Sequence, residues 1–131
     1  KALDISTRED IPYFYDLLSK FSLKIFFSDY TANMQSMIIN HPTILIYDKY
    51  KLKHNKKYSG IYDELYSSNI LFYSVEELIK FINQDLTTHE KILKWWFSSN
   101  VQKVRKKYLS KICRITDRID KEFMKTIYKI I

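Results

Sequence analysis

The sequence predicts an α/β domain, with a small parallel sheet of about three strands or more and helices on both faces. Residues 23–47 read as strand, polar turn, short helix, Asn-His-Pro turn and strand. The second of these strands, 43–47, is an unbroken apolar and β-branched run, which is typical of strands buried on both faces of a parallel sheet. A third strand is predicted at 70–73. Parallel strands need a crossover, usually a helix, and the crossover is right-handed almost without exception.

Apolar residues at helical spacing predict the remaining elements. The crossover helix is expected at 32–39, with Met34, Met37 and Ile38 on its buried stripe. Asn69 ends another helix, since asparagine tolerates the left-handed conformation there. Ser74, with Glu77 three residues on, predicts a capped helix start, and Thr87 or Thr88 begins a further helix. The other helices are predicted at 8–21, 58–67, 75–83, 88–97 and 101–115, with a helical continuation to 131.

Length and composition predict one domain over residues 1–131, with a polar lead-in at 1–10 and carboxy-terminal helices at 88–131. The single glycine excludes glycine-rich phosphate loops. The single cysteine, Cys113, excludes an internal disulfide and suits a reducing cytoplasm. No apolar run approaches the roughly 18–20 residues of a membrane span. The three histidines lack metal-ligand spacing, so neither a metal nor a cofactor is predicted.

The turn after the first strand is the candidate binding site. In open α/β sheets, ligands bind beyond the carboxyl ends of the strands. A helix start adds free amides and about half a positive charge, which suits phosphate. We therefore predict that Tyr30, Thr31, Ala32 and Asn33 bind a phosphate through the Thr31 hydroxyl and the amides of Ala32 and Asn33. The Asp29 carboxylate would repel phosphate, so its predicted role is to orient the turn. The alternative is an ordinary helix cap.

Other features have two interpretations each. The lysines of loop 48–57 can close over an anion or simply be solvated. Trp95 and Trp96 can form a stacking platform or anchor a helix. The basic helix beyond Val101 and the net charge of +7 favour binding to nucleic acid or to an anionic membrane surface. The alternative is that the basic residues form a solvated helix face. No specific nucleic-acid motif is present. The basic residues are Lys103, Arg105, Lys106, Lys107, Lys111, Arg114 and Arg118.

The turn Ser28-Asp29-Tyr30-Thr31-Ala32, followed by Asn40, Pro42, Thr43 and Ile44, resembles the phosphate-side turn of CDP-glycerol glycerophosphotransferases. A family of bacterial surface-carbohydrate biosynthesis transferases of the same general type is similar over more of the chain, from about Asp10 to Arg114. The order and spacing of several short motifs carry this resemblance. They are Phe14-Tyr15-Asp16-Leu17-Leu18, Tyr62 with Leu65, Asn69-Ile70-Leu71-Phe72, Ser74-Val75-Glu76-Glu77, Trp95-Trp96, Val101-Gln102 and Arg105.

Both groups are similar to two-domain glycosyltransferases of the GT-B type, whose carboxy-terminal, Rossmann-like half binds the nucleotide-linked donor. The resemblance implies a donor-binding half that takes a nucleotide-linked sugar or a CDP-glycerol-type donor and serves a glycan acceptor in surface polysaccharide synthesis. It places the catalytic base on a missing amino-terminal domain, which Trp95, Trp96 and Phe97 would face. No catalytic residue is expected in this chain, and the isolated chain is expected to be inactive. The expected location is cytoplasmic, at the inner face of the membrane. The alternative function is a basic nucleic-acid-binding or regulatory module without catalysis.

Overall fold

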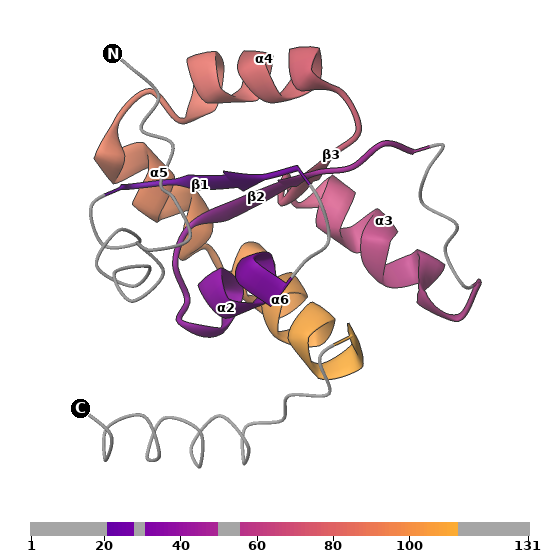
Figure 1. Cartoon of the computed structure of the whole chain (residues 1–131). Coiled ribbons are helices and arrows are strands. Elements are labelled where there is room, and N and C mark those ends of the chain that lie inside the picture. Colours follow the sequence, from indigo (N-terminus) through magenta and orange to yellow (C-terminus); the bar gives the residue numbers. More distant parts are fainter. Residues whose placement is uncertain (1–20, 28–30, 50–55, 113–131) are drawn as a thin grey trace, which may run out of the picture.

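The computed structural model describes residues 21–27, 31–49 and 56–112 (Figure 1). Its centre is a three-stranded parallel sheet in the order β1-β2-β3. The strands are β1 (Lys24–Phe26), β2 (Thr43–Ile46) and β3 (Leu71–Phe72). The predicted parallel α/β fold is confirmed. The predicted lead-in at 1–10, the helix at 8–21 and the helical continuation beyond 112 lie outside the described residues.

The central strand β2 explains the apolar run in the sequence. It pairs with β1 through Ile25 and Ile44, and with β3 through Ile46 and Phe72. All four of its residues are buried. Side chains alternate between the faces of a strand, so Ile44 and Ile46 enter one apolar cluster while Leu45 enters the other. Both faces are therefore covered.

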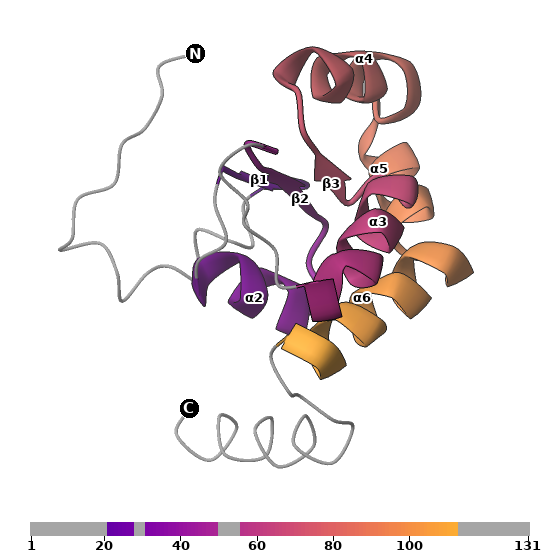
Figure 2. The ribbon, with the colours of Figure 1, turned by 90° about the vertical axis from the view of Figure 1, so that its right-hand side faces the viewer.

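Helices form a layer on each side of the sheet (Figure 2). One layer holds α2 (Thr31–Ile38), α3 (Ser59–Ser67) and α6 (Ser99–Ile112), which pack on the larger apolar cluster. The other holds α4 (Val75–Asp85) over the smaller cluster. Helix α5 (His89–Trp96) contributes Ile92 to the smaller cluster and Trp96 to the larger one. A short 3-10 helix, η2 (Lys56–Tyr58), precedes α3.

The predicted helix caps are present. The Ser74 side chain accepts a hydrogen bond from the Glu77 amide (3.2 Å), and the Thr88 side chain accepts one from the Lys91 amide (3.2 Å). The carboxylate that bonds the Ser74 hydroxyl is that of Glu76, at 2.9 Å. These local bonds fix where α4 and α5 begin.

The buried stripe of α2 differs from the prediction. Met37 is buried as expected, but its companions are Asn33 and Ser36, while Met34 is only partly buried. The reason is that this face carries paired polar groups. The Ser36 hydroxyl lies 2.7 Å from the Thr43 hydroxyl on β2, so a buried hydrogen bond replaces an apolar contact.

Helices α2 and α3 end in the same way before they lead into strands. Asn40 and Asn69 have φ of 59° and 60°, the left-handed conformation. The amide of the residue after each asparagine bonds back into the last turn, His41 to the Ser36 carbonyl (3.0 Å) and Ile70 to the Leu65 carbonyl (2.9 Å). This is the Schellman pattern, and the prediction for Asn69 is confirmed.

Two consecutive tryptophans bond to these two helix ends. The Trp95 indole N–H donates to the Ser68 carbonyl at 3.2 Å. The Trp96 indole N–H donates to the carbonyl (3.0 Å) and the side-chain oxygen (2.9 Å) of Asn40. Trp96 is fully buried. Residues 95–96 therefore tie α5 to the turns that precede β2 and β3.

Side chains of helix α6 also bond to the end of α2. The Gln102 side chain donates to the Asn40 side-chain oxygen at 3.0 Å. The buried Arg105 guanidinium donates to the Met37 carbonyl in the last turn of α2 and to the Gln102 side-chain oxygen (3.2 Å). A cation at this position also favours the negative end of the helix dipole.

Asn40 can be tested by substitution. Asn40→Gly should lower the free energy of unfolding by about 1 kcal/mol, because it removes the side-chain hydrogen bonds but tolerates the left-handed conformation. Asn40→Ala should cost a further ~1–2 kcal/mol for the conformation itself. Urea unfolding measures both. Equal losses in the two variants would contradict a conformational role for Asn40.

Lys24 on β1 gives a pH dependence. Burial lowers its pKa from 10.5 to about 8. Between these two pH values the unfolded chain binds more protons than the folded one, so the free energy of unfolding rises as pH increases from about 8 towards 10.5. Lys24→Met should be the more stable protein at pH 7, with an advantage that shrinks at high pH. Chemical denaturation across this range measures the difference, and an advantage that stays constant or grows would be the contrary result.

Candidate functional site

A cavity of about 320 Å³ lies at the carboxyl edge of the sheet. Residues that follow all three strands line it: Phe27 after β1, Tyr47 and Lys49 after β2, and Tyr73 after β3. Ile46, Asp48 and Val75 complete the wall. This is the edge at which open α/β sheets bind ligands. The cavity is therefore the first candidate site.

The first turn of α2 adjoins the cavity through its wall. The side-chain amide of Asn33 donates a hydrogen bond to the Tyr47 hydroxyl at 3.3 Å, and both residues are buried. Thr31, the first residue of α2, is exposed, and Ala32 is partly buried. Thus the Asn33 side chain holds the wall, and Thr31 is the exposed residue of the three at this helix start.

Two helices follow directly on strands at this edge, but their starts differ in charge. The first turn of α4 carries Glu76 and Glu77, so its own carboxylates complement the positive end of the helix. The pKa of Glu76 is lowered mainly by a hydrogen bond from its own backbone and further by one from the Ser74 side chain. The first turn of α2 has no acidic residue. Of these two helix starts, α2 is the one that favours an external anion.

The other walls of the cavity supply aromatic rings and a cation. The Lys49 ammonium lies 5.7 Å from the centroid of the Tyr73 ring. Tyr73 stacks on Tyr66, with ring centroids 5.3 Å apart. Burial raises the pKa of Tyr73, and the charges of Asp63 and Tyr66 raise it further, so the phenol keeps its proton at neutral pH. Phe27 is 72% exposed and offers an open aromatic face.

The structure describes only part of the predicted site. Thr31, Ala32 and Asn33 lie at the expected edge. Asp29, Tyr30 and loop residues 50–55 lie outside the described residues, so their roles stay predictions. Sequence reasoning did not single out Phe27, Tyr47 or Tyr73. Their shared signal was position, since each is the last residue of a predicted strand and directly follows an observed one.

At least one of the two consecutive tryptophans, Trp96, has a structural role. Trp96 is fully buried and bonds to Asn40, so of its two interpretations the helix anchor is confirmed, and its ring is not exposed towards another domain or a ligand. Its ring is needed in the core between α5 and α6. Trp95 is partly buried, and Phe97 is exposed, so a domain contact there stays a prediction.

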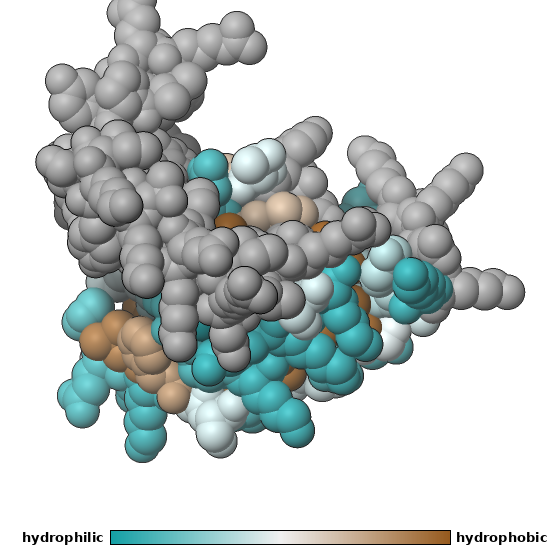
Figure 3. All heavy atoms as spheres, turned by 90° about the horizontal axis from the view of Figure 1, so that it is seen from below, coloured by the Kyte–Doolittle hydropathy of each residue, from teal (hydrophilic) through white to brown (hydrophobic). Residues whose placement is uncertain are grey.

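The basic helix presents fewer free charges than its sequence suggests. Arg105 is buried against α2, and Lys107 forms an ion pair with Glu64. Lys103, Lys106 and Lys111 are exposed, while Arg114 and Arg118 lie outside the described residues. In the view from below, teal, hydrophilic residues dominate the coloured surface, with brown, hydrophobic residues between them in several places (Figure 3). This arrangement suits a solvated face and weakens the nucleic-acid alternative.

Neither a metal-ligand cluster nor a membrane-spanning helix occurs among the described residues. Among them, no three His, Cys, Asp or Glu side chains gather as metal ligands would. None of the helices described here combines the length and the apolar character that crossing a membrane requires.

The family model described as LIC12162 family transferase matches residues 1–127. The chain belongs to the LIC12162 family of transferases. Neither the curated proteins nor the solved structures contain a match to it. As a member of a transferase family, the LIC12162-family chain is expected to serve a donor and an acceptor.

Several residues that carried the resemblance now have a common location in this LIC12162-family member. Asn40, Trp96, Gln102 and Arg105 form one hydrogen-bonded group at the end of α2. They lie on elements far apart in the sequence and meet at the amino edge of the sheet, away from the cavity. These four motif residues therefore support the scaffold.

Proposed function

We propose that this domain binds the nucleotide-linked donor of a glycosyl- or glycerophosphotransferase, as the donor half of a two-domain GT-B-type enzyme of surface polysaccharide synthesis. The observation that carries the proposal is that an acid-free helix start adjoins a cavity at the carboxyl edge of a parallel sheet. That combination suits a diphosphate, because the helix amides and dipole favour negative charge.

The diphosphate would contact the Thr31 hydroxyl and the amides of Ala32 and Asn33, as the sequence predicts. Lys49 lies in the same cavity and adds a positive charge that steers and holds an anion. Tyr30, in the same turn, is a further proposed contact, and Asp29 is proposed to orient the turn. The paired oxygens of a diphosphate can then be divided between the helix start and the lysine.

The nucleoside has an aromatic environment available. Phe27 and Tyr73 line the cavity, and Phe27 has an exposed ring on which a base can stack. The Tyr73 phenol, which is protonated at neutral pH, can donate to a ribose or base oxygen. This combination of aromatic rings and a cation fits a nucleotide better than a bare phosphate.

The chemical contribution of this half is electrostatic. As the bond to the diphosphate breaks, negative charge grows on the leaving phosphate. Amides fixed at the start of α2 stabilise that charge without reorganising. We propose that the base that deprotonates the attacking glycan acceptor belongs to an amino-terminal domain, and that the enzyme works in the cytoplasm at the inner face of the membrane.

Titration of the ¹⁵N-labelled chain with CDP, UDP, CDP-glycerol and UDP-sugars tests the proposal. The amides of Thr31 to Met34 and of Lys49 should shift on binding. Thr31→Val should weaken the tightest of these ligands about tenfold, since it removes a hydrogen bond to a charged group, and Lys49→Ala should do the same.

Lys103→Ala is the matched control for Lys49→Ala, because Lys103 is an exposed lysine on α6. It should leave affinity unchanged. If the three variants bind alike, or if the ligand moves another surface while Thr31 to Met34 stay still, the donor site is not at this edge.

A further inference from the structure

A second groove lies along the outer edge of the sheet, beside β3. It consists of two adjoining cavities of about 440 and 410 Å³. They form one groove because Asn69, Phe81, Gln84 and Asp85 line both. We call it the edge groove. Each part has the volume of a small-molecule site, about 300–1,000 Å³. It shares no lining residue with the carboxyl-edge cavity.

The floor of the edge groove is aromatic. Phe72 and Phe81 have ring centroids 5.5 Å apart, and Phe81 and Trp95 are 5.7 Å apart. Phe81 and Trp95 are only partly buried, so their rings remain accessible from the groove. The Phe81 and Trp95 rings meet edge to face, at an interplanar angle of 71°, and provide an apolar aromatic surface along the groove.

Trp95 is held firmly in this floor. Its indole N–H donates to the Ser68 carbonyl, and its ring packs on both Phe81 and Trp96. A ring that is already fixed loses little side-chain freedom when a ligand stacks on it. The arrangement is therefore preorganised for contact with a flat ligand face.

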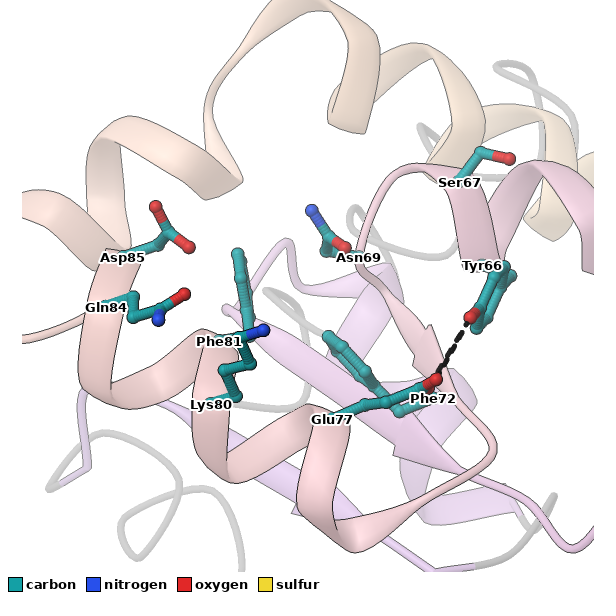
Figure 4. A pocket seen from close by; sticks show the side chains of 9 residues that line it. All are labelled: Tyr66, Ser67, Asn69, Phe72, Glu77, Lys80, Phe81, Gln84 and Asp85. Atoms are coloured by element: carbon teal, nitrogen blue, oxygen red, sulfur yellow. Dashed lines mark hydrogen bonds between the residues drawn. The ribbon is translucent and has the colours of Figure 1, made fainter.

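The rim of the edge groove is polar and mixed in charge. Figure 4 shows Lys80, Gln84 and Asp85 on α4 opposite Asn69 on the turn before β3, with Phe81 between them. Glu77 lies at one end, where its carboxylate accepts a long hydrogen bond from the Tyr66 hydroxyl (3.4 Å). The charged lining groups are Glu77, Lys80, Asp85, Lys91 and Lys94. Cations and anions nearly balance.

We propose that the edge groove binds a neutral oligosaccharide. A sugar ring has an apolar C–H face that packs on aromatic rings and a rim of hydroxyls that both donate and accept hydrogen bonds. The groove matches both, with an aromatic floor and a rim of carboxylates, amides and ammonium groups. The two carboxylates disfavour a polyanion, and the five charged groups disfavour an apolar helix.

The edge groove adjoins the carboxyl-edge cavity through one aromatic pair. Tyr66 lines the groove, Tyr73 lines the cavity, and their rings stack at 5.3 Å. An oligosaccharide in the groove thus extends towards the proposed donor site, as an acceptor chain should. This acceptor role rests on the proposed function, whereas saccharide binding itself does not.

NMR titration of the full chain with neutral tri- to pentasaccharides of glucose, galactose, mannose and N-acetylglucosamine tests the proposal. At least one should shift the indole N–H of Trp95 and the amides of Asn69, Phe81, Gln84 and Asp85. The amides of Thr31 to Met34, which report on the donor site, should shift less than those of the edge groove. If no member of the panel shifts the groove resonances, the proposal is wrong.

Substitutions on α4 sharpen the test. Gln84→Ala and Asp85→Ala should each weaken the best oligosaccharide about tenfold, since both side chains are exposed and line the groove. Asn83→Ala is the matched control, because Asn83 is an exposed neighbour that lines neither cavity. Equal affinities in all three variants would overturn the assignment. Titration with CDP separates this proposal from the donor site. If the variants lose the oligosaccharide but still bind CDP, the two sites are distinct. If the chain binds the oligosaccharide but not CDP, only the donor-site proposal fails.

Discussion

The fold depends on how the last backbone carbonyls of α2 obtain hydrogen-bond partners. A helix leaves its last carbonyls without partners inside the helix, and burial makes such groups costly. Here Asn40 turns the chain through a left-handed conformation, and Trp96, Gln102 and Arg105 from later helices bond to the turn and to the last helical carbonyls. Because β2 starts three residues after Asn40 and is the central strand, this group sets the position of the whole sheet.

As a consequence, the two edges of the sheet differ in what they carry. The amino edge carries the tryptophans, a buried guanidinium and the ends of α2 and α3, beside a cavity of about 270 Å³ that Asn40, His41 and Pro42 help to line. The carboxyl edge keeps a cavity and a helix start without acidic residues. A parallel sheet gathers these helix starts at the same edge, so the position of a phosphate site follows from topology once the helices are in place.

Charge is also organised by packing. A net charge of +7 suggests a polyanionic partner, yet the one arginine of described α6 is buried against α2 and one of its lysines pairs with Glu64. At the edge groove, lysines alternate with carboxylates and amides over aromatic rings. Local mixtures of this kind favour polar, neutral ligands, whereas the start of α2 with Lys49 favours anions. Two different chemistries can therefore lie side by side on one small domain.

The sequence by itself determined the local structure. The apolar and β-branched run 43–47 marks β2, asparagine tolerates the left-handed end of α3, and Ser74 and Thr88 start their helices through bonds to amides three residues away. It also pointed to the turn before α2. Only the tertiary structure decided that Trp96 and Arg105 serve the end of α2, that Asn33 holds Tyr47, and that α4 and β3 enclose a groove. These contacts join residues 14 to 68 positions apart. Helix caps and strand patterns depend on neighbours in the chain, while a long-range partner is set by the way the layers pack.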